Sequence, residues 1–303
     1  MNLSGLPGDV KDKVVRCLDM YNRGKAILLV GETGVGKSFL AREVHRASKW
    51  RNGNFIPVDL SSVESELFEL ELFGYENGAF TGARKNGKSG LVDQAQGGTL
   101  FFDEIGNLDL RFQKKFLVFL DEKRYRRLGG EKYIKLEAGV IFATNVNLER
   151  AISQGMFRED LYFRIKNCTI KIPPLRDRIE YLEEIIKNLI RKEKLRPLKF
   201  TRKAIDKLKE YPWPGNIREL LSYLTYWSVQ GIDIVKLENL PEEIKNHGDD
   251  YNYRMALRKY KWEFVVKVLK ISNWNINKAA KMMGISRQHI YRLIKELGID
   301  IGE

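Results

Sequence analysis

Runs of consecutive apolar residues recur in the first half of the chain and predict a buried parallel sheet. Three of them lack any polar alternation, as is typical of strands covered on both faces, and lie at residues 26–30, 99–102 and 139–143. Two other short stretches, at residues 55–59 and 168–172, mix apolar and polar residues and predict further strands. Because stretches of helical spacing separate the runs, the pattern predicts an α/β fold.

The second half of the chain has a different pattern. Pro173 and Pro174 close the last predicted strand, and helical spacing continues from there to residue 243. A polar break follows and is the best candidate for a linker. We therefore expect four segments: an α/β core over residues 1–173, a helical region over 174–245, a linker over 246–252 and a C-terminal helical domain over 253–303.

A glycine-rich stretch follows the first predicted strand directly. It reads GETGVGKS, fits G-x-x-x-x-G-K-[ST] and precedes a segment of helical spacing, the context that this phosphate-binding motif requires. Lys37 would supply a charge for the β- and γ-phosphates, and Ser38 a hydroxyl for Mg²⁺. The alternative, a chance set of turn glycines, arises in about one chain in a hundred of this length. The expected nucleotide-binding residues are Gly31, Glu32, Thr33, Gly34, Val35, Gly36, Lys37 and Ser38.

Polar residues end two of the other buried strands. Asp103 and Glu104 come after residues 99–102, and the carboxyl end of a parallel strand lies beside such a loop. Asp103 is suited to hold Mg²⁺, directly or through water, and Glu104 to orient the attacking water. The alternative is two carboxylates that begin a turn. Asn145, at the exit of the next strand, could sense the γ-phosphate or merely cap a helix.

Composition describes a soluble globular protein of two or three domains. The chain has 303 residues, of which 43% are hydrophobic and 31% charged. No apolar run approaches the length of a membrane span, and no secretory signal begins the chain. Cys17 and Cys168 show neither a C-x-x-C spacing nor a metal-ligand spacing, so a reducing cytoplasm is the expected compartment.

Positive charge is concentrated at the C-terminal end. The whole chain carries +13, and residues 253–303 hold eleven Lys and Arg against four acidic residues, a net +7. Residues 276–294 have the pattern of a helix-turn-helix, in which Gly284 ends the first helix and Ser286 caps the second. The expected DNA-binding residues are Ser286, Arg287, Gln288, Tyr291 and Arg292, of which the second helix would direct the last four toward the major groove and phosphates of DNA. A generic basic helical hairpin is the alternative.

Two other features have both a functional and a structural interpretation. Residues 74–84 hold three glycines around an isolated Phe80, which predicts a mobile loop whose aromatic tip touches a partner, unless Phe80 folds back on the core. Arg158 and Arg164 lie six residues apart, on different faces of a predicted helix, so one salt bridge would not explain both. Solvated surface arginines are the ordinary alternative.

These motifs together resemble the bacterial enhancer-binding proteins, the AAA+ activators of sigma-54 RNA polymerase, over nearly the whole chain. The most specific match is GAFTGA at residues 78–83, supported by GETGVGKS, GGTLFFDEIG, RRLGG, FREDLYFRI and WPGNIREL. The resemblance implies an AAA+ P-loop ATPase core, a helical lid and an all-α Fis-type DNA-binding domain. It also implies ATP and Mg²⁺ as cofactors and a homo-oligomeric ring, usually a hexamer, with a dimer as the DNA-bound unit.

The resemblance assigns roles to single residues. Phe80 and Thr81 would contact sigma-54, Arg158 and Arg164 would reach a neighbour's γ-phosphate, and Arg218 would be the sensor arginine of the lid. The expected function is ATP-dependent activation of sigma-54 polymerase from an upstream DNA site. The alternatives are a DNA-binding repressor that keeps the ATPase fold as an oligomerisation scaffold, and an AAA+ unfoldase or helicase loader.

Three departures from the family pattern matter. Asp59 occupies the slot where many relatives have an asparagine that restrains the catalytic glutamate, and an ionised carboxylate cannot donate that hydrogen bond. Ser38 stands where relatives often carry Glu. No receiver or sensory module precedes the ATPase region, so we expect control by expression level, by assembly or by a regulatory protein acting in trans.

Overall fold

The computed structural model describes residues 1, 3–61, 68–80, 86–247, 253–272, 274–297 and 299. The chain forms two compact units. The first unit comprises Met1–Leu198 and Pro212–Asp233, and the second comprises Lys199–Tyr211 and Ile234–Glu303. This division does not follow the boundaries expected from the sequence, which place residues 174–245 in one lid; those boundaries stay a prediction.

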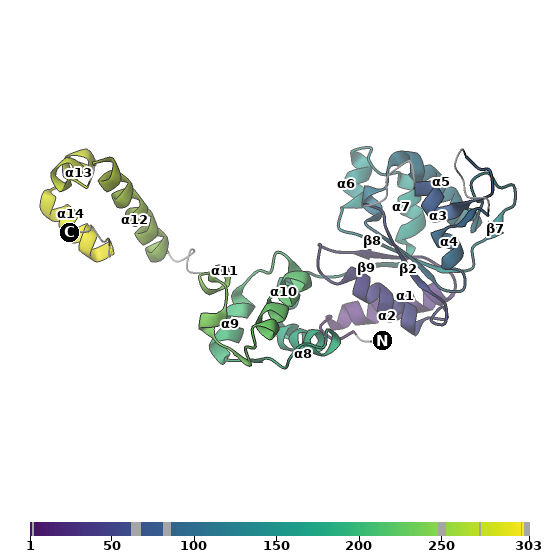
Figure 1. Ribbon diagram of the computed structural model, residues 1–303, viewed down its shortest axis with the longest axis horizontal. Coiled ribbons are helices and arrows are strands. Elements are labelled where there is room, and N and C mark those ends of the chain that lie inside the picture. Colours follow the sequence, from purple (N-terminus) through teal and green to yellow (C-terminus); the bar gives the residue numbers. More distant parts are fainter. Residues whose placement is uncertain are drawn as a thin grey trace. The chain divides into compact units, whose positions relative to one another are not determined.

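A five-stranded parallel sheet forms the centre of the first unit, in the order β2-β5-β8-β1-β9 (Figure 1). Its strands confirm the five predicted stretches and comprise β1 (Ile27–Val30), β2 (Phe55–Asp59), β5 (Thr99–Asp103), β8 (Gly139–Thr144) and β9 (Thr169–Lys171). In the register of the sheet Asp59 pairs with Asp103, and Val30 pairs with Thr144. The carboxyl ends of four strands therefore meet at one edge.

Helices cover both faces of this sheet (Figure 1). One face carries α1 (Gly8–Asn22) and α2 (Lys37–Ala47), and the other carries α3 (Phe68–Phe73), α4 (Leu91–Gln94), α5 (Leu110–Glu122), α6 (Leu148–Ser153) and α7 (Glu159–Ile165). Successive strand residues point to opposite faces, so Phe101 enters one core and Phe102 the other. This double coverage explains why the strands are apolar without alternation.

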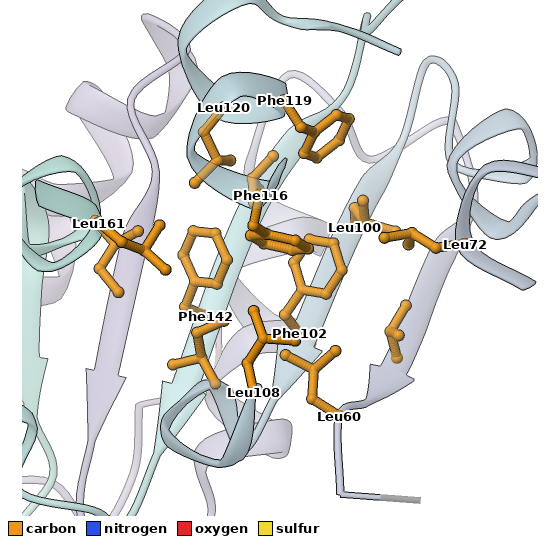
Figure 2. Packing of buried hydrophobic residues seen from close by; sticks show 14 of the residues in the cluster. Leu60, Leu72, Leu100, Phe102, Leu108, Phe116, Phe119, Leu120, Phe142 and Leu161 are labelled. Atoms are coloured by element: carbon orange, nitrogen blue, oxygen red, sulfur yellow. The ribbon is translucent and has the colours of Figure 1, made fainter. Parts of the chain in front are cut away.

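Aromatic rings fill the core beneath α5 (Figure 2). The ring of Phe102 lies 4.7 Å from that of Phe116 and 5.5 Å from that of Phe142, centroid to centroid. All three side chains are fully buried. Rings at these separations interlock strands β5 and β8 with helix α5, which fixes the sheet edge that carries the polar residues.

Short elements complete the first unit. Two-stranded pairs join β3 (Gly74–Tyr75) to β4 (Lys88–Ser89) and β6 (Arg124–Tyr125) to β7 (Ile134–Lys135). The 3₁₀ helices are η1 (Ile105–Asn107), η2 (Lys166–Cys168) and η3 (Leu175–Tyr181), and two helices follow, α8 (Leu182–Lys192) and α10 (Asn216–Val229).

The second unit contains the C-terminal helices. Its elements are β10 (Lys199–Phe200), α9 (Arg202–Glu210), β11 (Ile234–Val235), η4 (Leu237–Asn239), α11 (Glu242–Lys245), α12 (Tyr253–Ile271), α13 (Ile276–Met283) and α14 (Arg287–Leu297). Gly284 ends α13 in the left-handed region, at φ 67°, and the Ser286 hydroxyl accepts the His289 N–H at 3.2 Å. Both predicted helix boundaries are thus confirmed, and the helix-turn-helix is formed.

Cys17 and Cys168 form a disulfide with a Cα–Cα distance of 5.6 Å. The two residues are 151 positions apart and meet because α1 packs beside β9. The sequence spacing did not predict this pair. The disulfide differs from the reduced cysteines that the sequence analysis expected. Within the ranges that the structure describes, no helix has the length and apolar content to cross a bilayer.

Replacing Phe102 by alanine is expected to lower the free energy of unfolding of the first unit by about 3–5 kcal/mol, because it removes the ring that α5 and β8 share. Urea unfolding followed by circular dichroism measures the change. Val229→Ala, at a side chain that is 77% exposed, is the control and should leave the midpoint almost unchanged. Equal effects of the two substitutions would contradict this account of the core.

A candidate nucleotide-binding site

The glycine loop joins β1 to α2 over residues 31–36, as predicted. Gly34 and Gly36 have φ angles of +80° and +103°, which only glycine adopts readily. A Cβ on Gly34 would also lie 2.4 Å from the carbonyl oxygen of Gly215. The loop therefore needs glycine at position 34 both for its conformation and for its close approach to the segment before α10.

Lys37 begins α2 and turns back over the loop. Its side chain is 6% exposed, and its Nζ donates to the carbonyl oxygens of Gly31 at 2.9 Å and Glu32 at 3.2 Å. Its Nζ also lies 3.8 Å from Glu104 Oε1. Burial lowers the pKa of Lys37, the charges of Glu104 and Asp103 oppose that shift, and Arg218 adds to it. This ammonium is a buried donor whose partners are the loop's own carbonyls, a position suited to a phosphate.

The two predicted carboxylates meet the loop at the end of β5. The Ser38 hydroxyl donates to Asp103 Oδ2 at 3.1 Å, and the Glu104 N–H donates to Asp103 Oδ1 at 3.1 Å. Glu104 adopts the left-handed conformation, at φ 56° and ψ 46°, which turns its side chain away from the strand direction. The structure thus brings together Ser38, Asp103 and Glu104 as the sequence predicted.

Ser38 and Asp103 are the residues that could hold Mg²⁺. Magnesium prefers oxygen ligands, keeps several waters and usually takes only one or two carboxylates together with substrate phosphates. The hydroxyl and carboxylate oxygens of this pair fit that preference. Among the described residues no group of three or more metal-ligating side chains exists, so the ion would need phosphate oxygens to complete its shell.

Asn145 lies where the sequence placed it, at the exit of β8 next to the loop. Its Nδ2 donates to the Thr33 hydroxyl at 2.9 Å, and its backbone N–H donates to Glu104 Oε2 at 3.3 Å. Asp59 is opposite Asp103 in the sheet register, and its Oδ1 accepts the N–H and the hydroxyl of Ser61 at 2.9 and 2.6 Å. Asn145 therefore contacts both the loop and Glu104.

Two residues that the sequence analysis missed hold Glu32. Arg176 pairs with both carboxylate oxygens of Glu32, and Asn216 Nδ2 donates to Glu32 Oε2 at 3.1 Å. These hydrogen bonds, that of Arg176 foremost, lower the pKa of Glu32 to about 2. Asn216 is fully buried, has φ 54°, and also binds the Thr33 carbonyl and the Leu175 N–H. It thereby connects the loop to both η3 and α10.

Arg178 is a third residue that the sequence did not single out. Its guanidinium is 4% exposed and donates to the carbonyl oxygens of Gly5 at 3.1 Å and Val35 at 2.7 Å. Burial lowers the pKa of Arg178 to about 10. This side chain joins the N-terminal segment to the glycine loop.

The glycine loop, the end of β5 and Arg178 line a cavity of about 520 Å³, within the usual range for a small-molecule site. One part is polar and includes Lys37, Ser38, Asp103, Glu104 and Arg218. The other part is mainly apolar, with the side chains of Leu3, Leu6, Ile185, Leu189, Ile217 and Leu221. A cavity with a phosphate-binding loop at one end and an apolar slot at the other is suited to a nucleoside triphosphate.

The structure does not bring Arg158 and Arg164 to this cavity. Arg158 is the N-cap residue of α7 and pairs with Asp160, with Nη2 2.7 Å from Oδ2. Arg164 lies in the last turn of α7, where its Nε is 2.7 Å from Asp121 Oδ1 and its Nη2 donates to the Leu120 carbonyl. The different partners agree with the expectation that one salt bridge does not explain both arginines.

Phe80 is 41% exposed, and its ring lies 5.1 Å from that of Tyr75 in an edge-on arrangement. It therefore contacts the base of its own loop and still presents a face to solvent. Thr81, the second predicted contact residue, lies outside the described residues, as do positions 82–85.

The predicted DNA-reading side chains share one face of α14. Arg287, Gln288, Tyr291 and Arg292 are exposed, whereas Ile290 and Ile294 on the same helix are buried against α12 and α13. The guanidinium carbon of Arg287 lies 5.7 Å from the centre of the Tyr291 ring. The structure therefore leaves all four side chains accessible to a nucleic acid.

Comparisons with known proteins agree across the whole chain. The sigma-54 interaction domain matches residues 8–171, the AAA+ ATPase lid domain residues 176–262 and the bacterial regulatory protein, Fis family, residues 263–297. The sigma-54-dependent transcriptional activator SfnR of Pseudomonas putida is 39% identical over 89% of this chain and 78% of its own length.

The DNA-binding transcriptional regulator NtrC of Rhizobium meliloti is 32% identical over 91% of this chain, which spans only 65% of the length of that relative. A crystal structure of NtrX from Brucella abortus in complex with ATP superimposes with a TM-score of 0.69 at 28% identity, covering 96% of this chain and 68% of that one.

Replacing Glu32 by glutamine should reduce stability at neutral pH and not at low pH. The pKa of Glu32 in the folded chain, about 2, is below the ordinary 4.5, so its ion pair stabilises the fold above about pH 5 and the contribution is lost as the pH falls toward 2. We expect a loss of about 0.5–1 kcal/mol at pH 7, because solvent screens this exposed pair. Urea unfolding at pH 7, 5 and 3.5 measures the change.

Arg176→Met should show the same pH dependence, and the double variant should lose little more than either single one. A loss that stays constant from pH 7 to pH 3.5 would contradict the assigned ion pair.

Proposed function

This chain belongs to the sigma-54-dependent transcriptional activators, with an AAA+ domain and a Fis-type helix-turn-helix, and from that premise we propose that it couples ATP hydrolysis to remodelling of the sigma-54 RNA polymerase closed complex. The observation that carries this proposal is the convergence of Lys37, Ser38, Asp103 and Glu104 on one cavity. The place of action is the cytoplasm, where promoter DNA and polymerase are found.

The chemistry follows from the placement of the polar groups. Lys37 stabilises charge on the β- and γ-phosphates, and Ser38 and Asp103 would hold Mg²⁺, which when bound supplies further positive charge for the transition state. Glu104 orients the attacking water, and the Asn145 N–H keeps that carboxylate in place. Arg218 lines the cavity from α10, where it senses the phosphates.

The position of Arg164 supports an assembly of several copies. Arg164 lines a small cavity that also contains Lys25 and Ala26, just before β1, whereas the glycine loop follows the carboxyl end of that strand. The four residues of β1 alone span about 13 Å, so Arg164 does not reach the phosphates of its own copy. Arg158 and Arg164 serve the neighbour's nucleotide in a homo-oligomeric ring, which the family resemblance makes a hexamer.

Hydrogen bonds and ion pairs hold the residues at the base of the GAFTGA loop, as a loop that transmits a movement requires. The Glu76 N–H donates to the Leu128 carbonyl at 2.9 Å, and the Leu128 N–H donates to the Gly74 carbonyl at 3.0 Å. Arg127 pairs with Glu76 and Asp93, each at 3.2 Å. Nucleotide state raises or lowers the tip at Phe80 and Thr81, which contacts sigma-54.

The C-terminal helices bind the upstream DNA site, with α14 in the major groove. The basic residues of this domain supply phosphate contacts, and Arg287 and Gln288 face the bases. The DNA-bound unit is a dimer, and the ring assembles on it.

Two other functions fit parts of the chain. A DNA-binding repressor would keep the ATPase fold as an oligomerisation scaffold, and the intact GAFTGA sequence argues against it. An AAA+ unfoldase or helicase loader would have no use for the helix-turn-helix. In vitro transcription with sigma-54 polymerase separates the three, because only the proposed activator should yield open complexes that depend on ATP hydrolysis.

Lys37→Ala should abolish nucleotide-dependent work, because the phosphates lose their buried cation. We expect ATP turnover to fall at least about 100-fold, the scale of losing one preorganised donor. Phosphate release measures turnover, and Lys187→Ala, at an exposed lysine on α8, is the control. Undiminished turnover in the Lys37 variant would refute the assigned site.

Thr81→Ala should separate the two activities, because the family resemblance assigns Thr81 to the sigma-54 contact and not to nucleotide binding. ATP hydrolysis should remain largely intact while transcription activation disappears. Parallel measurement of phosphate release and open-complex formation tests this. Loss of both activities together would refute the proposed division of labour.

A further inference from the structure

A second, smaller cavity of about 110 Å³ lies at the amino-terminal edge of the central sheet. Four of its lining side chains are cations, namely Arg23, Lys25, Lys123 and Arg164, and none is acidic. The rest of the lining comes from small and apolar residues in α5, before β1, and before and within β8, together with Asn167. We call this the basic cavity.

The charge of the basic cavity is only partly compensated. Arg23 pairs with Asp19 at 3.0 Å, and Arg164 pairs with Asp121 at 2.7 Å. Within the described residues neither Lys25 nor Lys123 forms an ion pair. Lys123 Nζ donates to the Gly24 carbonyl at 3.0 Å, a neutral partner. Burial and the like charges of Arg164, Lys25 and Lys49 lower the pKa of Lys123. The four cations therefore leave an excess positive charge that an anion would relieve.

The backbone holds Lys123 in this place at some cost. Lys123 follows α5 as its C-cap residue with φ 48° and ψ 39°, the left-handed region that a lysine rarely adopts. This conformation directs the side chain to Gly24, in the turn that leads into β1. Such strain is expected where the direction of a side chain matters.

The topology excludes the nucleotide of the same copy as the anion. The basic cavity is at the amino-terminal edge of the sheet, and the glycine loop is at the carboxyl edge, with β1 between them. A head-to-tail contact between copies instead brings different surfaces of the chain together. Arg164 and Lys123 both line the basic cavity, so a neighbour's phosphate that entered it would face both cations.

We propose that the basic cavity binds phosphate oxygens of the nucleotide held by an adjacent copy, with Lys123 as a further catalytic cation beside Arg164. This inference rests on the proposed ring. Only one Lys123 donor is used on Gly24 among the described residues, so the others are available to a phosphate. A lysine acts there as a point charge that stabilises negative charge developing on the transferred phosphoryl group.

The first test compares Lys123→Gln with Lys123→Arg in the full chain. Both keep a long side chain in the left-handed conformation, and only the arginine keeps the charge. We expect kcat for ATP to fall about 10- to 100-fold in K123Q and to be largely restored in K123R. Lys49→Met, at a nearby lysine that does not line the cavity, is the control. Full activity in K123Q, or equal loss in K123R with the native melting temperature, would overturn the proposal.

The second test asks whether Lys123 acts across the contact between copies. K37A lacks a working nucleotide site but retains the basic cavity. K123Q retains the nucleotide site but lacks the charge of Lys123 in the basic cavity. Coexpressed, they should yield more ATP turnover than either alone, as should K37A with Arg164→Ala. Recovery with R164A but not with K123Q would overturn the role of Lys123 and leave the ring intact. Recovery with neither would contradict the ring itself, and with it the proposed function.

A third measurement distinguishes the sources of phosphate. Inorganic phosphate is titrated into K37A and into the double variant K37A/K123Q at a concentration where the chain is not assembled. We expect inorganic phosphate to bind both variants weakly, with equal heats of binding. Tight binding to K37A that the double variant loses would assign the basic cavity to free phosphate and overturn the contact with a neighbour's nucleotide.

Discussion

The parallel pairing of β1, β5 and β8 is the constraint on which the rest of this molecule depends. It places the ends of three strands at one sheet edge, so that Lys37, Asp103 and Asn145 meet although more than a hundred positions separate the first from the last. The aromatic packing under α5 keeps that register, because a shift by one residue would exchange Phe101 and Phe102 between two different cores. The chemistry of the edge is thus a consequence of the packing beneath it.

The same constraint explains what the sequence could predict. Unbroken apolar runs predicted three of the five strands and two mixed stretches the others, and the glycine loop and the carboxylate pair each combine a local motif with the end of a strand. Gly284 and Ser286 were predictable because helix caps depend on nearby residues.

Other features depend on the tertiary fold. Arg176 and Asn216 reach Glu32 across 144 and 184 positions, and Cys17 meets Cys168 across 151. No local pattern encodes such contacts. The sequence offers only an asparagine after Pro-Gly in WPGNIREL, a residue type that tolerates positive φ, and this signal names neither partner of Asn216. The division of residues 174–245 between the two compact units also depends on packing. The first unit includes α8 and α10, whereas the second includes α9.

Asp59 shows how a single departure from the family pattern changes a local restraint. An ionised carboxylate accepts hydrogen bonds, and Asp59 accepts two from Ser61. Glu104 also only accepts, so these two acids do not share a hydrogen bond while both are ionised. The donors that reach Glu104 are instead the Asn145 N–H and, at 3.8 Å, the Lys37 ammonium. Both belong to the edge of the sheet that carries the glycine loop, so the orientation of the Glu104 carboxylate depends on the loop and the end of β8 rather than on the end of β2.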